Sequence, residues 1–161
     1  LKEAVFVNGD SDTAAAIASL TQRIREKPVD VGAIGIGENA HIAFNDPPAN
    51  FETREAYHVV RLDTRCKLQQ VGEGWFASEG EVPDEAISMT AWQIMQCQCI
   101  VSAVPGSVKA DAVHKVLSAQ KADPMVPGSL LKTHPDFHLF IDTDAASRCS
   151  KELLSRFKRE E

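Results

Sequence analysis

Long apolar runs, an excess of basic residues and an initiator methionine are all missing from this 161-residue sequence. No stretch approaches the roughly 18–20 apolar residues that a membrane-spanning helix needs. Seventeen lysine and arginine residues against 23 acidic residues leave a formal charge of −6, so electrostatic capture of nucleic acid is not expected. The chain starts directly at Leu1 and shows no targeting leader.

The cysteines are enough in number for two disulfides, but a chain of this length does not need such cross-links and nothing else in the sequence favours them. The four cysteines are Cys66, Cys97, Cys99 and Cys149. Cys97 and Cys99 do not have the two-residue separation of common zinc sites, and His134 and His138 flank a proline without further cysteine or histidine nearby. We therefore interpret these side chains as structural, and a reducing cytoplasm as the compartment that fits best.

The residues that are present suit one globular α/β domain. Apolar residues make up 43% of the chain, an ordinary share for a protein of this size. Continuous apolar strands are predicted at residues 31–36, 99–104 and 137–141, and they alternate with helical patterns. This alternation predicts a doubly wound, mainly parallel sheet with helices on both faces, as in Rossmann-like folds. Further expected elements are a strand at 4–7, a helix capped by Ser11 or Asp12, a strand at 57–62, an irregular segment at 71–85, a helix after 107 and a closing helix capped by Thr143.

The segment that follows the strand at 31–36 carries the residues best suited to chemistry. It leaves the carboxyl end of a buried strand, where open α/β sheets bind their ligands. Gly35 and Gly37 allow a tight turn and a close approach of the backbone to a ligand. His41 and Asp46 follow, with Asn39 beside them, and a carboxylate near a histidine can fix its tautomer for general acid–base catalysis.

Two further interpretations concern phosphate. Residues 35–40 match the glycine spacing of a dinucleotide-binding turn, but that turn must open a helix, and the two prolines at 47–48 leave no room for one. Lys109 lies just after the turn that ends the strand at 99–104, in the first turn of a predicted helix. The amides of a helix N-terminus favour an anion, so Lys109 is either a phosphate ligand or a solvated surface lysine.

These segments resemble one known family. The loop at residues 35–48 closely resembles the signature loop of glucosamine-6-phosphate deaminases. Matching motifs follow in the expected order at residues 83–90, 104–109 and 125–134. The more distant 6-phosphogluconolactonases share the fold but normally not the sequence Ile-Ala-Phe-Asn after the histidine.

The resemblance implies conversion of an amino-sugar phosphate to fructose 6-phosphate and ammonia without cofactor or metal. It assigns His41 to opening of the sugar ring, by moving a proton at the ring oxygen, and Asp46 to orienting and tuning that histidine. It assigns Lys109 to the substrate phosphate and places Gly37 at the substrate. The implied partner is a small hexosamine phosphate, with no nucleic acid or membrane, and the resemblance leaves a homo-oligomer open.

The sequence also departs from the family pattern. Asn39 stands in the catalytic acid–histidine–acid arrangement where the family commonly has aspartate, and Ala40 stands where it commonly has glycine. Gln70 falls at the position of a substrate-binding arginine, so Arg65 or Lys67 is a candidate replacement.

The length is the largest departure, since the family usually has about 240–270 residues, more than one ordinary domain of this size. We therefore expect residues 1–161 to be the C-terminal portion of a single deaminase/isomerase domain. Two other functions stay open: a lactone hydrolase in which His41 activates water, and a fragment that binds sugar phosphate without turnover.

Overall fold

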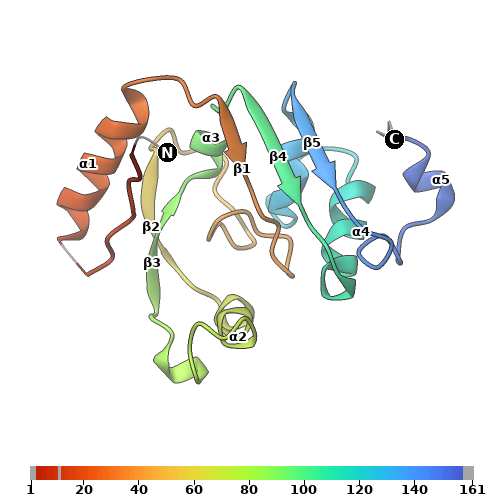
Figure 1. Ribbon diagram of the computed structural model, residues 1–161, viewed down its shortest axis with the longest axis horizontal. Helices are drawn as coiled ribbons and strands as arrows, with labels where there is room; N and C mark the ends of the chain where they lie inside the picture. Colours follow the sequence, from red (N-terminus) through yellow and green to blue (C-terminus); the bar gives the residue numbers. More distant parts are fainter. Residues whose placement is uncertain (1–2, 11, 158–161) are drawn as a thin grey trace.

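A three-stranded parallel sheet forms the centre of the computed structural model, which describes residues 3–10 and 12–157. Its order is β1 (Val31–Ala33), β4 (Cys99–Ala103) and β5 (Phe137–Phe140), with Val31 opposite Cys99 and Ile100 opposite Phe137. The three strands run side by side in the same direction, so their carboxyl ends meet at one edge (Figure 1). This mainly parallel sheet with its helices confirms the predicted α/β fold class.

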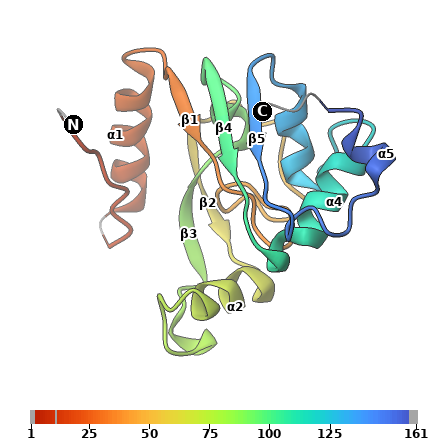
Figure 2. The same ribbon diagram turned by 45° about the vertical axis from the view of Figure 1, so that its right-hand side comes forward.

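A second, antiparallel sheet joins β2 (Tyr57–Arg61) to β3 (Glu85–Met89). Helix α1 (Thr13–Arg25) packs on this pair through a small cluster that includes Leu20 and Tyr57. Figure 2 shows α1 on the outer side of the strands, away from the other helices. Helix α2 (Thr64–Gly72) follows β2, and the short 3₁₀ helix η1 (Glu79–Glu81) leads into β3.

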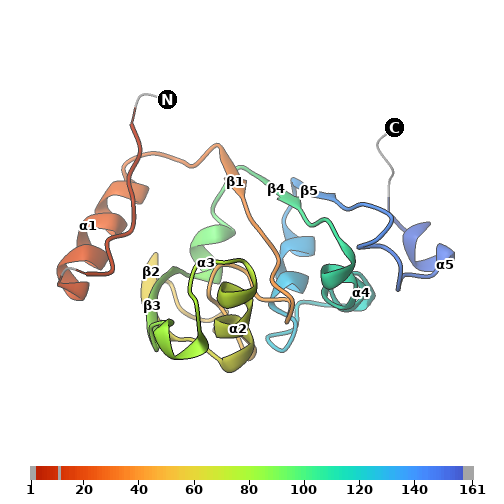
Figure 3. The same ribbon diagram turned by 60° about the horizontal axis from the view of Figure 1, so that its bottom comes forward.

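The main core lies between the parallel sheet and the helices on one of its faces. These elements are α3 (Ala91–Ile94), the 3₁₀ helix η2 (Ser107–Lys109) with α4 (Ala110–Ser118), the 3₁₀ helix η3 (Pro127–Thr133), and the terminal α5 (Lys151–Leu154). Ile100, Val113 and Leu131 are completely buried here. Figure 3 shows α3 and α4 on the same side of the sheet. On the opposite face, Val31 is 57% and Phe140 51% exposed.

Two local expectations are corrected, and one helix was not expected from the sequence. Residues 4–7 form no strand, because no neighbouring strand pairs with them in the described chain, and Phe6 is 85% exposed. Residues 64–72 form α2, which sequence patterning did not predict. The closing helix is short, and Ser150 caps it instead of Thr143, because residues 143–149 form turns in which the Ala145 amide donates to the Asp142 carboxylate. Asp12 caps α1 as expected, whereas Ser11 lies outside the described residues.

Within the described part of the chain, every helix falls short of the length and apolar character that crossing a bilayer requires.

Candidate functional site

The candidate site begins in a compact turn at the carboxyl end of β1. The Gly37 amide donates to the His41 carbonyl at 2.9 Å, and the Ala40 amide donates to the Gly37 carbonyl at 2.9 Å. The His41 ring lies directly over Gly37: a Cβ added to this glycine would stand 2.3 Å from His41 Nε2. Glycine is therefore needed at position 37 to admit the histidine ring. Ala40 turns the chain with a left-handed φ of 70°, a conformation that glycine adopts more easily.

His41 and Asp46 come together as the sequence predicted. His41 Nδ1 lies 3.0 Å from Asp46 Oδ1, and both side chains are at least nine-tenths buried. The two atoms are at ion-pair distance, but their geometry does not meet that of a hydrogen bond. Burial alone would raise the pKa of the Asp46 carboxyl, but contacts with His41 and Asn39 outweigh it and lower the pKa. Asp46 is thus an anion beside a buried imidazole, the arrangement that holds one tautomer of a histidine.

Asn39 acts as a bridge in this site rather than as a charge. Its side-chain oxygen accepts from the His41 amide at 3.0 Å. Its side-chain nitrogen donates to Asp46 Oδ1 at 2.9 Å and to Asp63 Oδ2 at 3.3 Å. An aspartate at position 39 would place a third carboxylate against Asp46 and Asp63, and the like charges would repel one another. The neutral amide of Asn39 instead donates hydrogen bonds to both carboxylates.

Asp63 and Cys66 belong to the site although sequence reasoning did not single them out. Asp63 caps α2 by accepting from the Cys66 amide at 2.6 Å, and its own amide approaches Asp46 Oδ2 at 3.5 Å. The Cys66 thiol, 1% exposed, lies within 4.8 Å of the reactive atoms of His41 and Asp46. Burial, followed by the nearby Asp46 and Asp63 carboxylates, raises the pKa of Cys66 to about 12, so it is a neutral thiol. The sequence did offer one sign of this arrangement: Asp63 stands three residues before Cys66, and aspartate commonly caps the first turn of a helix.

A cleft of about 660 Å³ lies between α2 and the start of α4, and its wall includes Glu38 and Arg65, sequence neighbours of this group, but not His41, Asp46, Asp63 or Cys66 themselves. Lys109 and Lys115 contribute positive charge from one side and Arg65 from the other, and Glu38 connects the cleft to the His41 loop. The cleft wall comprises Glu38, Arg65, Leu68, Gln69, Gly72, Glu73, Val108, Lys109, Asp111 and Lys115.

Gln70, the expected counterpart of a substrate-binding arginine, does not line this cleft. Positions 65, 68, 69 and 72 of α2 follow helical spacing and share the face toward the cleft. Residue 70 lies about 100° further around the helix from Gln69, which turns it away. Lys67 pairs with Asp84 instead of reaching the cleft, so Arg65 is the α2 cation that shares the cleft with Lys109.

Comparison with known proteins finds several glucosamine-6-phosphate deaminases among the relatives in sequence. No protein-family model matches the chain. A glucosamine-6-phosphate deaminase from Clostridium novyi is 42% identical over 120 residues, which cover 74% of this chain and 48% of the relative. One from Listeria welshimeri is 33% identical over 147 residues, covering 91% of this chain and 61% of the relative. The chain thus spans about half the length of the first curated relatives it matches, 48% for the Clostridium novyi protein.

Solved structures agree in fold. A monomeric glucosamine-6-phosphate deaminase superposes with a TM-score of 0.81 at 32% identity, covering 88% of this chain and 58% of the other. A 6-phosphogluconolactonase from Trypanosoma brucei has a TM-score of 0.57 at 17% identity, covering 87% and 56%. At that identity the second likeness concerns the fold alone.

Proposed function

We propose, because this chain is related to the glucosamine-6-phosphate deaminases in sequence and in fold, that it carries the ring-opening and phosphate-binding parts of an amino-sugar-phosphate deaminase/isomerase. The reaction is conversion of glucosamine 6-phosphate, or a similar hexosamine phosphate, to fructose 6-phosphate and ammonia. The observation that carries the proposal is the buried His41–Asp46 pair beside a cleft that contains Lys109 and Arg65.

His41 is the proton-transfer group in this proposal. Its Nδ1 faces the Asp46 carboxylate, so Nε2 is the atom that exchanges a proton with the ring oxygen of the sugar. Asp46 supports both states of the histidine, because it orients the neutral ring and stabilises the imidazolium that forms. Asn39 and the capped N-terminus of α2 hold Asp46 in place.

Lys109 and Arg65 bind the phosphate from opposite walls of the cleft. A phosphate between them faces a point charge on one side and a planar guanidinium on the other. The acidic residues Glu38 and Glu73 line the same cleft, and the amine of a hexosamine is the substrate group that they suit.

Calorimetric titration of the 161-residue chain with glucosamine 6-phosphate tests the binding half of the proposal. We expect Lys109→Met to weaken binding by at least about tenfold, the effect of losing a charge-assisted contact. Lys121→Met, which removes an exposed lysine outside the cleft, is the matched control and should bind as the parent chain does. Equal affinities for the two variants would contradict the phosphate assignment.

Ammonia release by the natural full-length protein tests the catalytic half. We expect His41→Ala to abolish turnover of glucosamine 6-phosphate and to retain most of the binding. Turnover of 6-phosphogluconolactone in place of the amino sugar would show the lactone hydrolase instead. Binding without turnover of any hexosamine phosphate would favour the non-catalytic module.

A further inference from the structure

The two strands β4 and β5 bring together residues that lie far apart in the sequence. Ile100 pairs with Phe137 and Val101 with His138, and the Ile100 amide donates to the Asp136 carbonyl at 2.8 Å. Side chains alternate along a strand, so Cys99 on one strand and Asp136 and His138 on the next share one face of the sheet. This is the face opposite the helices that bury Ile100.

The ligating atoms of these three residues form a tight group. Cys99 Sγ, an Asp136 carboxylate oxygen and a ring nitrogen of His138 all lie within 4.8 Å of one another. His138 Nε2 is 2.8 Å from Asp136 Oδ1, and the two side chains are 38% and 53% exposed. An ion from solvent can therefore reach the group without unfolding the sheet.

A buried histidine, His134, fixes the backbone next to Cys99 and Asp136. His134 is 8% exposed, and its Nε2 lies 2.8 Å from the Cys97 carbonyl. Its Nδ1 accepts from the Asp136 amide at 3.1 Å. His134 thus ties the entry of β5 to the entry of β4, which positions Asp136 next to Cys99 before any ligand binds.

We propose that Cys99, Asp136 and His138 form a binding site for a zinc ion, with water as the fourth ligand. One thiolate, one imidazole and one carboxylate are each a regular zinc ligand, and the mixed set suits zinc better than the oxygen-seeking magnesium or calcium. On binding, the Cys99 thiol releases its proton to solvent and the sulfur donates to the metal. The bound ion links β4 to β5.

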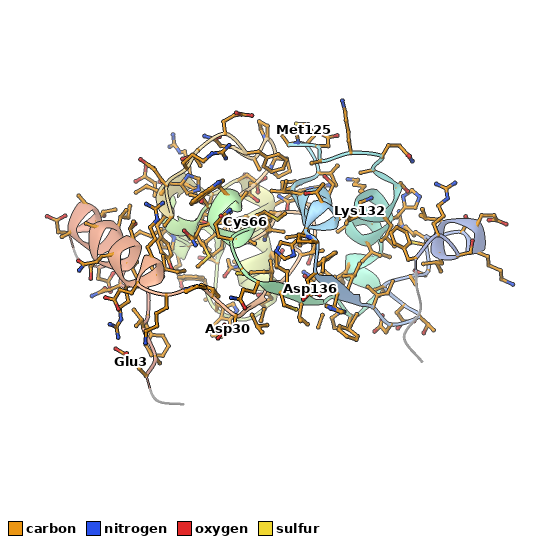
Figure 4. The ribbon with its side chains drawn as sticks, turned by 90° about the horizontal axis from the view of Figure 1, so that it is seen from above. Glu3, Asp30, Cys66, Met125, Lys132 and Asp136 are labelled. Atoms are coloured by element: carbon orange, nitrogen blue, oxygen red, sulfur yellow. The ribbon has the colours of Figure 1, made fainter. Side chains whose placement is uncertain are left out.

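The proposed zinc site is separate from the candidate sugar-phosphate site. Cys99 opens β4 and Asp136 precedes β5, whereas His41 follows the carboxyl end of β1, so the two sites lie at opposite ends of the parallel sheet. Figure 4 views the molecule from the end at which the parallel strands begin, with Asp136 labelled there. The test of the zinc site is consequently independent of the proposed function.

Cobalt(II) titration of the tag-free, reduced chain tests the site, because a cobalt–thiolate bond gives a strong near-ultraviolet absorption band. We expect one cobalt ion per chain, displaced by one zinc ion. Cys99→Ser should abolish the band, and His138→Gln and Asp136→Asn should each weaken zinc binding at least tenfold. Cys149→Ser and His114→Gln are the controls and should leave the band and the affinity unchanged.

Among the residues that the structure describes, one group competes for the metal: His41, Asp46 and Cys66, whose ligating atoms are also within 4.8 Å of one another. A band that survives Cys99→Ser and disappears in Cys66→Ser would assign the metal to that group and overturn the proposal. Absence of the band in the parent chain would overturn it as well. Circular dichroism confirms that each variant is folded, and the isosteric Asp136→Asn tests the site even if Cys99→Ser unfolds the strand.

Discussion

At the scale of single residues, the candidate site depends on one close contact between a ring and a backbone. His41 occupies the space that a side chain at position 37 would need, and the same turn brings His41 to Asp46. Gly35, two residues earlier, has open space around its missing Cβ. The two glycines look alike in the sequence, but only Gly37 must lack a side chain to make room for the His41 ring.

Gly37→Ala should displace the His41 ring and lower the free energy of unfolding by about 1–3 kcal/mol, the usual cost of overpacking. Binding of glucosamine 6-phosphate should weaken in the same variant. Gly35→Ala is the matched control and should leave both quantities near those of the parent chain, since its Cβ meets nothing within 4 Å. Urea unfolding and calorimetry measure the two effects, and equal losses in both variants would contradict the contact.

At the scale of elements, helix α2 supports the site through its first turn. Asp63 caps the helix, accepts from Asn39 and brings its amide toward Asp46. The helix also presents Arg65 to the cleft. Both roles therefore belong to the first turn of α2, where the Asp63 cap holds Asp46 and Arg65 supplies positive charge for a phosphate.

Asp63→Ala should cost about 1 kcal/mol of stability, as the loss of a helix cap does, and should also weaken glucosamine 6-phosphate binding. Asp12→Ala removes the comparable cap of α1, where Asp12 accepts from the Ala15 amide at 3.0 Å, far from the site in the chain. We expect a similar loss of stability there with unchanged binding. Thermal unfolding and calorimetry separate the outcomes; identical binding by both variants would show that α2 only supports the fold.

At the scale of the whole molecule, the parallel sheet has one packed face and one open face. Phe137 points with Ile100 toward the main core, whereas Phe140 belongs to the other face and is 51% exposed. Both phenylalanines lie in β5, Phe137 on the packed face of the sheet and Phe140 on the open face.

Phe137→Thr should therefore lower the free energy of unfolding by about 2 kcal/mol or more, because it removes apolar packing from the core. Phe140→Thr should change it by less than about 0.5 kcal/mol, as surface substitutions usually do. Urea unfolding of the two variants under the same conditions makes the comparison. A larger loss for Phe140→Thr would mean that the open face is packed in solution.

The sequence by itself determined the parts of this protein that depend on neighbours along the chain. The apolar strands expected at 31–36 and 99–104, the glycine turn, and a histidine five residues before an aspartate are local patterns. The structure contains each of them, although the first strand ends at Ala33 instead of residue 36. That residues 1–161 are the C-terminal portion of a single domain stays a prediction.

Only the tertiary structure decided which distant residues meet. Helix α2 folds back so that Asp63 and Cys66 enclose Asp46, and its period turns Arg65 toward the cleft and Gln70 away. Parallel pairing of β4 with β5 places Cys99 beside His138, two residues whose spacing in the sequence led us to interpret them as structural. The physical reason is that strand register and helix packing follow from burial of the whole core, which no short segment encodes.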